Sequence, residues 1–450
     1  DRRTGDHTGM SALLTFLGVV LFVLGILISV GLHEAGHMLP AKAFGMKVSQ
    51  FFVGFGRTVW SFKRGETEYG IKLIPAGGFV RIIGMMPPGK NSQDPAGPLR
   101  VRKANTGPIQ SMVENARSAE YETIEPADDG RLFYQKVWWK KLIVMASGPL
   151  VNVAIAFVLF AGLFMLYGTN VAQTTISTVT DCVVPASQAS ANRQCQPGDK
   201  KSPAQQAGFK VGDKILSFNG TPINSWDELT PLIRANTDKP ATIVVERNGQ
   251  RIPPLHTRTI VNQVYENATS NKLVSVGFLG VSPVQKVERQ NFGFVVNKMG
   301  ELTVGTVQAL GNFPQKLVGV AKSIVGGQRD QNSPMSVVGA SRVAGEVASN
   351  NALTGGERIA FLVSLLASLN LFLALFNFIP LLPLDGGHMI GAIWEGIRRG
   401  FAKIAGRPDP GYVDVAKLLP IAYVAASFIV VMGVLLVIAD IVNPIKLFNG

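Results

Sequence analysis

Two histidines and a glutamate stand at a spacing that can support hydrolysis: His33, Glu34 and His37 form a His-Glu-x-x-His pattern. On a helix, residues four apart lie on one face, so the two imidazoles can hold one zinc ion. The glutamate beside the first histidine can then act as general base towards a water in the open coordination position. The pattern predicts one Zn²⁺ bound by His33 and His37, with Glu34 as the catalytic residue.

The elements that must position these residues are expected to be membrane helices. The chain has 450 residues, 47% hydrophobic and 16% charged, and a mean hydropathy of +0.24. Four long stretches contain no Asp, Glu, Lys or Arg: Ser11–Leu32, Leu142–Thr180, Ile359–Leu384 and Leu418–Ala439. A helix of about 20 apolar residues crosses the bilayer core. We therefore expect a polytopic α-helical membrane protein with about four transmembrane helices, in contact with the lipid bilayer.

The formal charge of +13 is concentrated beside these apolar runs. Basic residues precede the second run and separate the third from the fourth: Lys136, Lys140, Lys141, Arg398, Arg399, Lys403 and Arg407. The positive-inside rule makes these flanks cytoplasmic and puts both termini and residues 171–357 outside. No nucleic-acid-binding motif accompanies the charge, and we expect no nucleic-acid partner.

Catalytic zinc usually needs a third protein ligand. His7 lies in the N-terminal tail and His256 in the outside segment, so neither is expected to approach. Asp385 and His388 stand at the downstream end of the third run, on the same side of the membrane as His33 and His37. From spacing alone either one could complete the site.

Polar and helix-breaking residues interrupt the third run. Pro380 and Pro383 break the helix, which is tolerated at membrane depth where the backbone lines a cavity. Asn377, in this run, and Asn152, in the second, are polar among apolar neighbours. Each could bind a substrate backbone or steady an oxyanion, or could make an interhelical hydrogen bond.

The loops carry further signals. In the first, residues 47–86 alternate β-formers with glycines and predict a membrane-associated β-hairpin or sheet, whereas 87–135 read as a mobile insertion. Between Ser202 and Arg247, strand, Asn-Gly turn, helix and strand signals describe a small α/β sandwich. Cys182 and Cys195 lie in the same outside segment and are candidates for a disulfide.

These signals give a complete predicted organisation. Its parts are an N-terminal tail or tag remnant at 1–9, a first membrane helix at 10–38, a cytoplasmic-side loop at 39–141, a second helix at 142–170, the sandwich domain at 171–290, an amphipathic helix and linker at 291–357, a third membrane segment at 358–388, a cytoplasmic loop at 389–417, a fourth helix at 418–442 and a C-terminal tail at 443–450.

Taken in order, the motifs resemble the site-2 protease family of intramembrane zinc metalloproteases, in particular the bacterial branch with an extracytoplasmic PDZ domain. The motifs that carry the resemblance are His33-Glu34-x-x-His37, Gly54-Phe55-Gly56, Glu68-Tyr69, Pro75-x-Gly77-Gly78, Trp139-Lys140-Lys141, Gly148-Pro149-x-x-Asn152 and Leu384-Asp385-Gly386. The block Ser202–Asn219 looks like PDZ. Gly326–Asp330, Val338–Ser341 and the cysteine pair are similar to the actinobacterial, mycobacterial-type member.

The resemblance implies several assignments that spacing leaves open. It makes Asp385 the third zinc ligand, leaves His388 behind it, and has Asn377 contact the scissile strand, with Asn152, Gly54, Gly56, Gly77 and Gly78 in support. Substrates would be single-pass membrane proteins, chiefly anti-sigma factors, cut within the bacterial cell membrane after an upstream site-1 type protease. The β-region would pair with the unwinding substrate, and the PDZ domain would exclude uncleaved substrates.

Two other classes of protein compete with this interpretation. A catalytically silent membrane PDZ scaffold or chaperone would be expected to have lost one of His33, Glu34, His37 or Asp385, and all four are present. A small transporter using intramembrane polar groups would need neither a glutamate beside paired histidines nor a PDZ-like domain.

Overall fold

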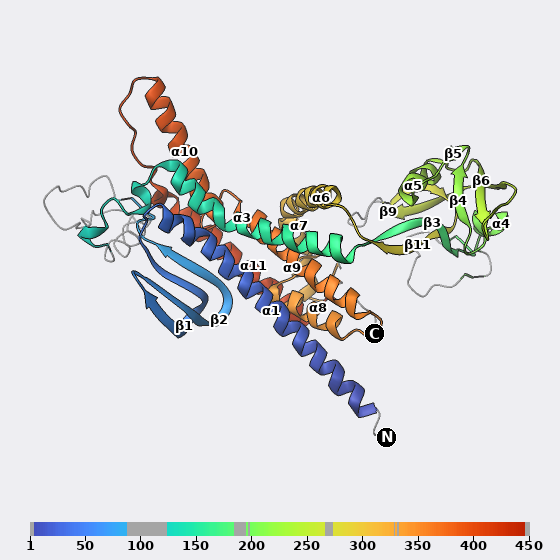
Figure 1. The fold of residues 1–450 in the computed structure, drawn as a ribbon, viewed down its shortest axis with the longest axis horizontal. Coiled ribbons are helices and arrows are strands. Elements are labelled where there is room, and N and C mark those ends of the chain that lie inside the picture. The colour runs from blue at the N-terminus through green and yellow to red at the C-terminus, as the bar shows by residue number, and fades with distance from the viewer. Residues whose placement is uncertain are drawn as a thin grey trace. The chain divides into compact units, whose positions relative to one another are not determined.

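The chain divides into two compact units, one formed by Asp1–Leu163 with Asn291–Gly450 and the other by Phe164–Gln290 (Figure 1). The structure, a computed structural model, describes residues 4–87, 124–183, 195–196, 199–265, 273–327, 329–330 and 333–445. Most of the predicted mobile insertion at 87–135 lies outside the described residues, as do residues 1–3 and 446–450 of the predicted tails.

Four helices in the described part of the first unit are long and apolar enough to cross a membrane: Gly9–Ala43, Trp138–Tyr167, Gly355–Asn377 and Val415–Val442. They correspond to α1 (Thr4–Ala43), α3 (Trp138–Gly162) with the following turn Leu163–Tyr167, α9 (Gly355–Asn377), and α11 (Leu419–Val442) with the preceding turn Val415–Leu418. These spans coincide with the four uncharged runs of the sequence, because a helix satisfies its own backbone hydrogen bonds where no water is available. The chain is a multi-pass membrane protein.

Several predicted boundaries were wrong. Helix α1 begins at Thr4, so the expected tail at 1–9 is largely helical. The expected single amphipathic helix is two helices, α6 (Phe292–Gly311) and α7 (Phe313–Ile324), divided at Asn312. A proline at the second position of the new helix explains this division, since proline fits the first turn of a helix but not its interior.

Two further helices lie where loops were expected. Helix α8 (Val337–Ser349) lies within the expected linker that ends at 357, and α10 (Asp385–Ile404) extends from the third membrane segment into the expected loop at 389–417. In α8 the small residues serve packing: a Cβ on Gly345 would lie 2.9 Å from Thr15 Cγ2 of α1. Small residues allow helix backbones to approach closely. Their tertiary role therefore outweighed their weak helix propensity.

The β-region after α1 is a sheet with four passes built from two bent strands. Strands β1 (Val48–Arg64) and β2 (Thr67–Ile82) are antiparallel, and residues 50–53 of β1 pair with both 78–81 and 68–71 of β2. The register places 78–82 at one edge and 58–64 at the other. In Figure 1 this sheet lies beside α1. Val48, Phe51, Tyr69 and Val80 pack in one cluster with Met38 of α1.

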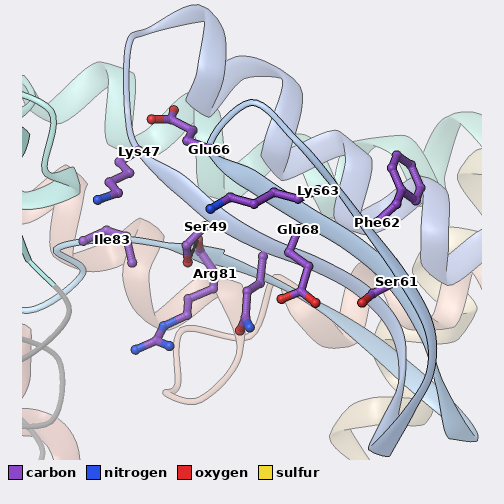
Figure 2. A pocket seen from close by; sticks show the side chains of 10 residues that line it. Lys47, Ser49, Ser61, Phe62, Lys63, Glu66, Glu68, Arg81 and Ile83 are labelled. Carbon is purple, nitrogen blue, oxygen red and sulfur yellow. Dashed lines mark hydrogen bonds between the residues drawn. The ribbon is translucent and has the colours of Figure 1, made fainter.

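One row of polar side chains crosses all four passes. Arg81, Gln50, Glu68 and Lys63 are successive cross-strand neighbours. They line a pocket of about 480 Å³ together with Ser61 and others, shown in Figure 2. None of the predicted site residues lines this pocket. At the bent end of the sheet the large apolar side chains are exposed: Val59, Trp60, Ile71, Leu73 and Ile74.

The second unit is built around an antiparallel sheet with the strand order β11-β3-β4-β6-β7. Its strands are β3 (Thr169–Val179), β4 (Lys214–Phe218), β5 (Thr221–Pro222), β6 (Pro240–Arg247), β7 (Gln250–Arg251), β8 (Leu255–Arg258) and β11 (Val281–Glu288), with β9 (Ile260–Tyr265) and β10 (Leu273–Phe278) as a separate pair. The helices α4 (Pro203–Ala207) and α5 (Trp226–Ala235) complete it. A core that includes Ile215, Leu229 and Ile243 is fully buried. Cys182 and Cys195 form a disulfide.

A buried ion pair fixes the start of β4 in this unit. The Asp213 carboxylate is fully buried and accepts hydrogen bonds from Arg247 Nε at 2.7 Å, from Arg247 Nη2 at 2.8 Å and from the Lys210 backbone N–H at 2.8 Å. Burial by itself would raise the pKa of Asp213. The Arg247 guanidinium and the Lys210 amide outweigh it and hold this pKa below its usual value.

We expect Asp213→Asn to destabilise the second unit by about 3 kcal/mol at pH 7, because it leaves Arg247 without its partner. A lowered folded-state pKa contributes stability above the unfolded value, about 3.9, and this contribution is lost as the pH falls further. The difference from wild type should therefore be constant near neutrality and shrink below about pH 4. Hydrogen-exchange protection of the β4 amides measures this difference in stability. The control is Asp238→Asn, which breaks the exposed pair with Arg258 and should change the stability little. A stability loss equal to that of Asp213→Asn would contradict the role given to the buried pair.

Candidate metal centre

Two helices supply the polar side chains that meet in the first unit. His33 and His37 lie one turn apart near the end of α1, and both are buried. After α9 the chain turns at 378–384 and restarts as α10 with Asp385 as its first residue. The turn is tight, because a Cβ on Gly387 would lie 2.5 Å from the Leu382 backbone nitrogen. Glycine at this position lets α10 begin close to the end of α9.

The three side chains converge on one point. The distance from Asp385 Oδ2 is 3.3 Å to His33 Nε2 and 3.4 Å to His37 Nε2, and the two Nε2 atoms are 3.2 Å apart. Among the described residues this is the only group of three or more His, Cys, Asp or Glu side chains close enough to hold a metal ion. The fold thus selects Asp385, rather than His388, as the third member of the cluster.

The spacing of the three donors fits a zinc ion. Ligands placed tetrahedrally at about 2.0–2.1 Å from zinc lie about 3.3–3.4 Å from one another. The edges of the observed triangle are 3.2, 3.3 and 3.4 Å. Two imidazoles with one carboxylate is also a donor set used by catalytic zinc, with one position left for water.

Helix α3 holds His37 in place. The Nδ1 atom of His37 lies 2.7 Å from the carbonyl oxygen of Val144, which fixes the ring with Nε2 turned towards the cluster. A Cβ on Gly148, also in α3, would collide with the His37 imidazole. A Cβ on Gly36 would lie 2.9 Å from the Ser147 carbonyl oxygen. The glycines therefore allow α1 and α3 to cross closely enough for the Val144 contact.

Glu34 lies between the cluster and the sheet. A Cβ on Gly78 would be 3.1 Å from Glu34 Cγ, and the Val80 backbone lies beside the Glu34 carboxylate. Both residues belong to the outer pass 78–82 of the sheet. The edge of the sheet and the carboxylate therefore face each other beside the three donors.

The other predicted glycines shape the sheet at a distance from the cluster. Gly54 has a φ of +94°, and a Cβ there would lie 2.9 Å from the carbonyl oxygens of Lys72 and Ile74. A Cβ on Gly77 would lie 2.7 Å from the Phe55 ring. Gly56 is exposed at the bend. These glycines allow the strands to curl and approach one another.

The two predicted asparagines occupy different environments. Asn377 is the last residue of α9 and is half-buried, directly before the turn that leads to Asp385. Asn152 is buried on α3, one turn beyond Gly148, and its Oδ1 has no hydrogen-bond partner. Neither belongs to the group of metal-binding donors.

The sequence analysis missed several residues around the cluster. Val144 acts through its backbone, which no side-chain pattern can reveal. Gly148 was quoted within a motif but given no role against His37. His388, by contrast, was expected behind Asp385; its Nδ1 is buried and has no hydrogen-bond partner among the described residues. Lys141 forms an ion pair with Glu395. The charge of Lys141 beside an apolar segment was the one feature of the sequence that indicated such a pair.

Comparison with known proteins agrees with this geometry. Residues 21–407 match peptidase family M50. The chain is 36% identical to the zinc metalloprotease Rip1 of Mycobacterium tuberculosis over 443 residues, covering 96% of this chain and 99% of the relative. It is 35% identical to the Rip1 protein of Mycolicibacterium smegmatis over 451 residues, with the same coverage. The chain therefore belongs to peptidase family M50, the site-2 family of zinc metalloproteases.

Proposed function

We propose that this protein is an intramembrane endopeptidase that uses one zinc ion, bound by His33, His37 and Asp385, with Glu34 as general base. The observation that carries the proposal is the triangle of donor atoms with edges of 3.2–3.4 Å beside Glu34. All of these residues lie on or next to helices that can span a membrane. Intramembrane ionisable groups are costly and mark functional sites.

The residues divide the chemistry among them. A bound zinc ion would polarise the scissile carbonyl and lower the pKa of a water. Glu34 would accept a proton from the attacking water and return it to the leaving amine nitrogen. Val144 would keep the His37 ring in one tautomer through Nδ1. Asn377, next to the turn before Asp385, would hold the substrate backbone.

The sheet provides a means of presenting an extended substrate. A peptide bond inside a helix is shielded, so a membrane segment must unwind before it is cut. The pass 78–82 stands at one edge of the sheet, where it pairs with residues 48–53. A substrate strand added along it would run past Gly78 and Glu34. The exposed Trp60, Leu73 and Ile74 fit immersion of the bent end in the bilayer.

The second unit supports a role in substrate choice. Its small antiparallel sheet, two helices and disulfide suit an extracytoplasmic PDZ domain. We propose that it excludes substrates that an upstream protease has not yet shortened. The preferred substrates would be single-pass membrane proteins such as anti-sigma factors. The basic flanks favour a zinc site near the cytoplasmic side of the cell membrane, with both termini and the PDZ domain outside.

Glu34→Gln should keep stoichiometric zinc and lower the rate of cleavage of a membrane-anchored reporter by about 10²–10⁴-fold, because the amide cannot accept the proton. Zinc content and cleavage are measured on the same purified full-length protein. Glu301→Gln, an exposed glutamate on α6 paired only with Lys298, is the control and should cleave normally. Wild-type cleavage by the Glu34 variant would show that the base is another group.

Asp385→Ala should bind less than one zinc ion per chain, because only two imidazoles remain. His388→Ala should still reach one ion per chain in excess zinc, since His388 is not among the three clustered donors. Metal analysis after desalting distinguishes the two variants. Full zinc in the Asp385 variant together with loss in the His388 variant would reverse the ligand assignment.

Gly148→Ala should weaken zinc binding, because the added methyl would displace the His37 ring from the Val144 carbonyl. Changes in the groups that orient a metal-binding histidine typically cost 10–100-fold in metal affinity. Gly162→Ala on the same helix is the matched control, since a Cβ there meets nothing within 4 Å. Chelator competition measures both affinities, and equal values would remove the proposed role of Gly148.

A further inference from the structure

A buried ion pair joins α3 to α10 away from the three donors. Lys141 Nζ lies 2.5 Å from Glu395 Oε2, and the two side chains are only 6% and 2% exposed. Desolvating two charges costs several kcal/mol per ion, so a buried pair adds little net stability and is explained better by a positional role. The proposed reaction uses neither residue.

The segment after α10 closes over this pair. The Val413 backbone N–H donates to Glu395 Oε2 at 3.3 Å, and the Arg399 guanidinium lies 3.5 Å from Glu395 Oε1. The Tyr412 ring lies 5.5 Å from Lys141 Nζ and also 5.5 Å from the Arg399 guanidinium carbon. The pair is therefore enclosed on several sides, which strengthens its electrostatic hold on α10.

A cavity of about 20 Å³ separates the pair from His388. Lys141, Glu395 and His388 all line it, together with Ala392. Among the described residues, the buried His388 Nδ1 has no hydrogen-bond partner, and the buried Glu395 Oε1 has only the ionic contact with Arg399 at 3.5 Å. A water molecule needs about 10–15 Å³ and two to four polar partners. The volume is sufficient for a single water, and Lys141, His388 and Glu395 in the lining carry polar groups.

Helix α3 places this arrangement in register with the metal centre. Lys141 precedes Val144 and Gly148, the two contacts of His37, by three and seven residues, so all three lie on one face of α3. Next to Glu395, a Cβ on Gly396 would lie 2.6 Å from the Trp138 ring, so α10 packs closely against α3 here. One helix thus contacts both elements that carry the donors.

We propose that the Lys141–Glu395 pair, linked to His388 through one buried water, is a positioning device that holds α10 so that Asp385 meets His33 and His37. The inference rests on the zinc centre proposed above. Glu395 is ten residues after Asp385, about 15 Å along the helix. Because α10 is a continuous helix, a rotation or slide at Glu395 displaces the Asp385 carboxylate.

The test compares Glu395→Gln with a matched control in the purified full-length protein. Asp440→Asn breaks another buried ion pair of the first unit, with Arg329, whose side chains are 2% and 3% exposed and lie 2.7 Å apart. That pair joins α11 to the segment before α8 and does not involve α10. Both variants should lower the unfolding temperature, because each leaves a buried cation unpaired.

Zinc affinity and the visible spectrum of the Co²⁺-substituted protein report on the position of Asp385. The unfolding temperature reports on the stability of the whole unit. Glu395→Gln should bind zinc about 10–100-fold more weakly and alter the Co²⁺ d–d bands, whereas Asp440→Asn should match wild type in both. Equal losses in the two variants, or a folded Glu395→Gln with wild-type affinity and spectrum, would overturn the proposal. Wild-type protein that binds no zinc would instead overturn the proposed function.

Ala392→Val tests the water without changing any charge. Ala392 is buried and lines the cavity, so two added methyl groups would fill the space of the water. The Co²⁺ bands should shift while the Lys141–Glu395 pair remains. An unchanged spectrum would remove the water from the proposal, and if Glu395→Gln does not fold, this result decides the proposal as a whole.

Discussion

The structure depends on one constraint: polar groups inside an apolar helix bundle must satisfy one another. The donor atoms of His33, His37 and Asp385 lie within 3.4 Å of each other. A carboxylate and two imidazoles are costly in such surroundings unless they are paired or bind a cation. The close crossings, the helix break and the restart at Asp385 all serve to bring these atoms together.

Helix α3 contributes no donor to the cluster, yet it touches both elements that do. Its Val144 carbonyl fixes His37, its Gly148 makes room for the imidazole, and its Lys141 binds Glu395 of α10. One face of α3 thus carries all three contacts: a backbone carbonyl, a glycine without a side chain and a buried cation. The precision of a metal site commonly depends on such supporting contacts as much as on the ligands themselves.

The sheet beside α1 lies next to this centre. Two bent strands make four passes, and Gly78 in the outer pass lies against Glu34. Edge strands are normally covered or blunted, because they invite pairing. The outer pass beside Glu34 therefore supports the proposed recognition of an extended peptide.

The second unit is held together in a different way from the membrane unit. Its core is a conventional buried apolar cluster, and its main buried charge, Asp213, is neutralised by Arg247 and by a backbone amide. Its disulfide joins Cys182 to Cys195 across a short separation. Buried polar groups are thus paired in both units, but with a separate set of partners in each.

The sequence by itself determined the membrane helices and the zinc motif. Uncharged runs long enough to span a bilayer have few other uses, and His33, Glu34 and His37 are local enough for helical periodicity to place them on one face. The break at Pro380 and Pro383 was also readable, because proline acts on its own neighbourhood. Periodicity and local composition did not reveal α8, the helical extent of α10 or the division between α6 and α7.

Spacing alone left Asp385 and His388 open, because both lie on the first turn of α10; the resemblance implied Asp385, and the tertiary structure brings Asp385 to the two histidines. It also supplied the Val144 carbonyl, the role of Gly148 and the pairing of Lys141 with Glu395, which are 254 residues apart. These features arise where helices cross, and a crossing is set by packing over whole helix faces. Local sequence patterns therefore identified the candidate reacting groups. Contacts between residues far apart in the sequence fixed the positions of these groups.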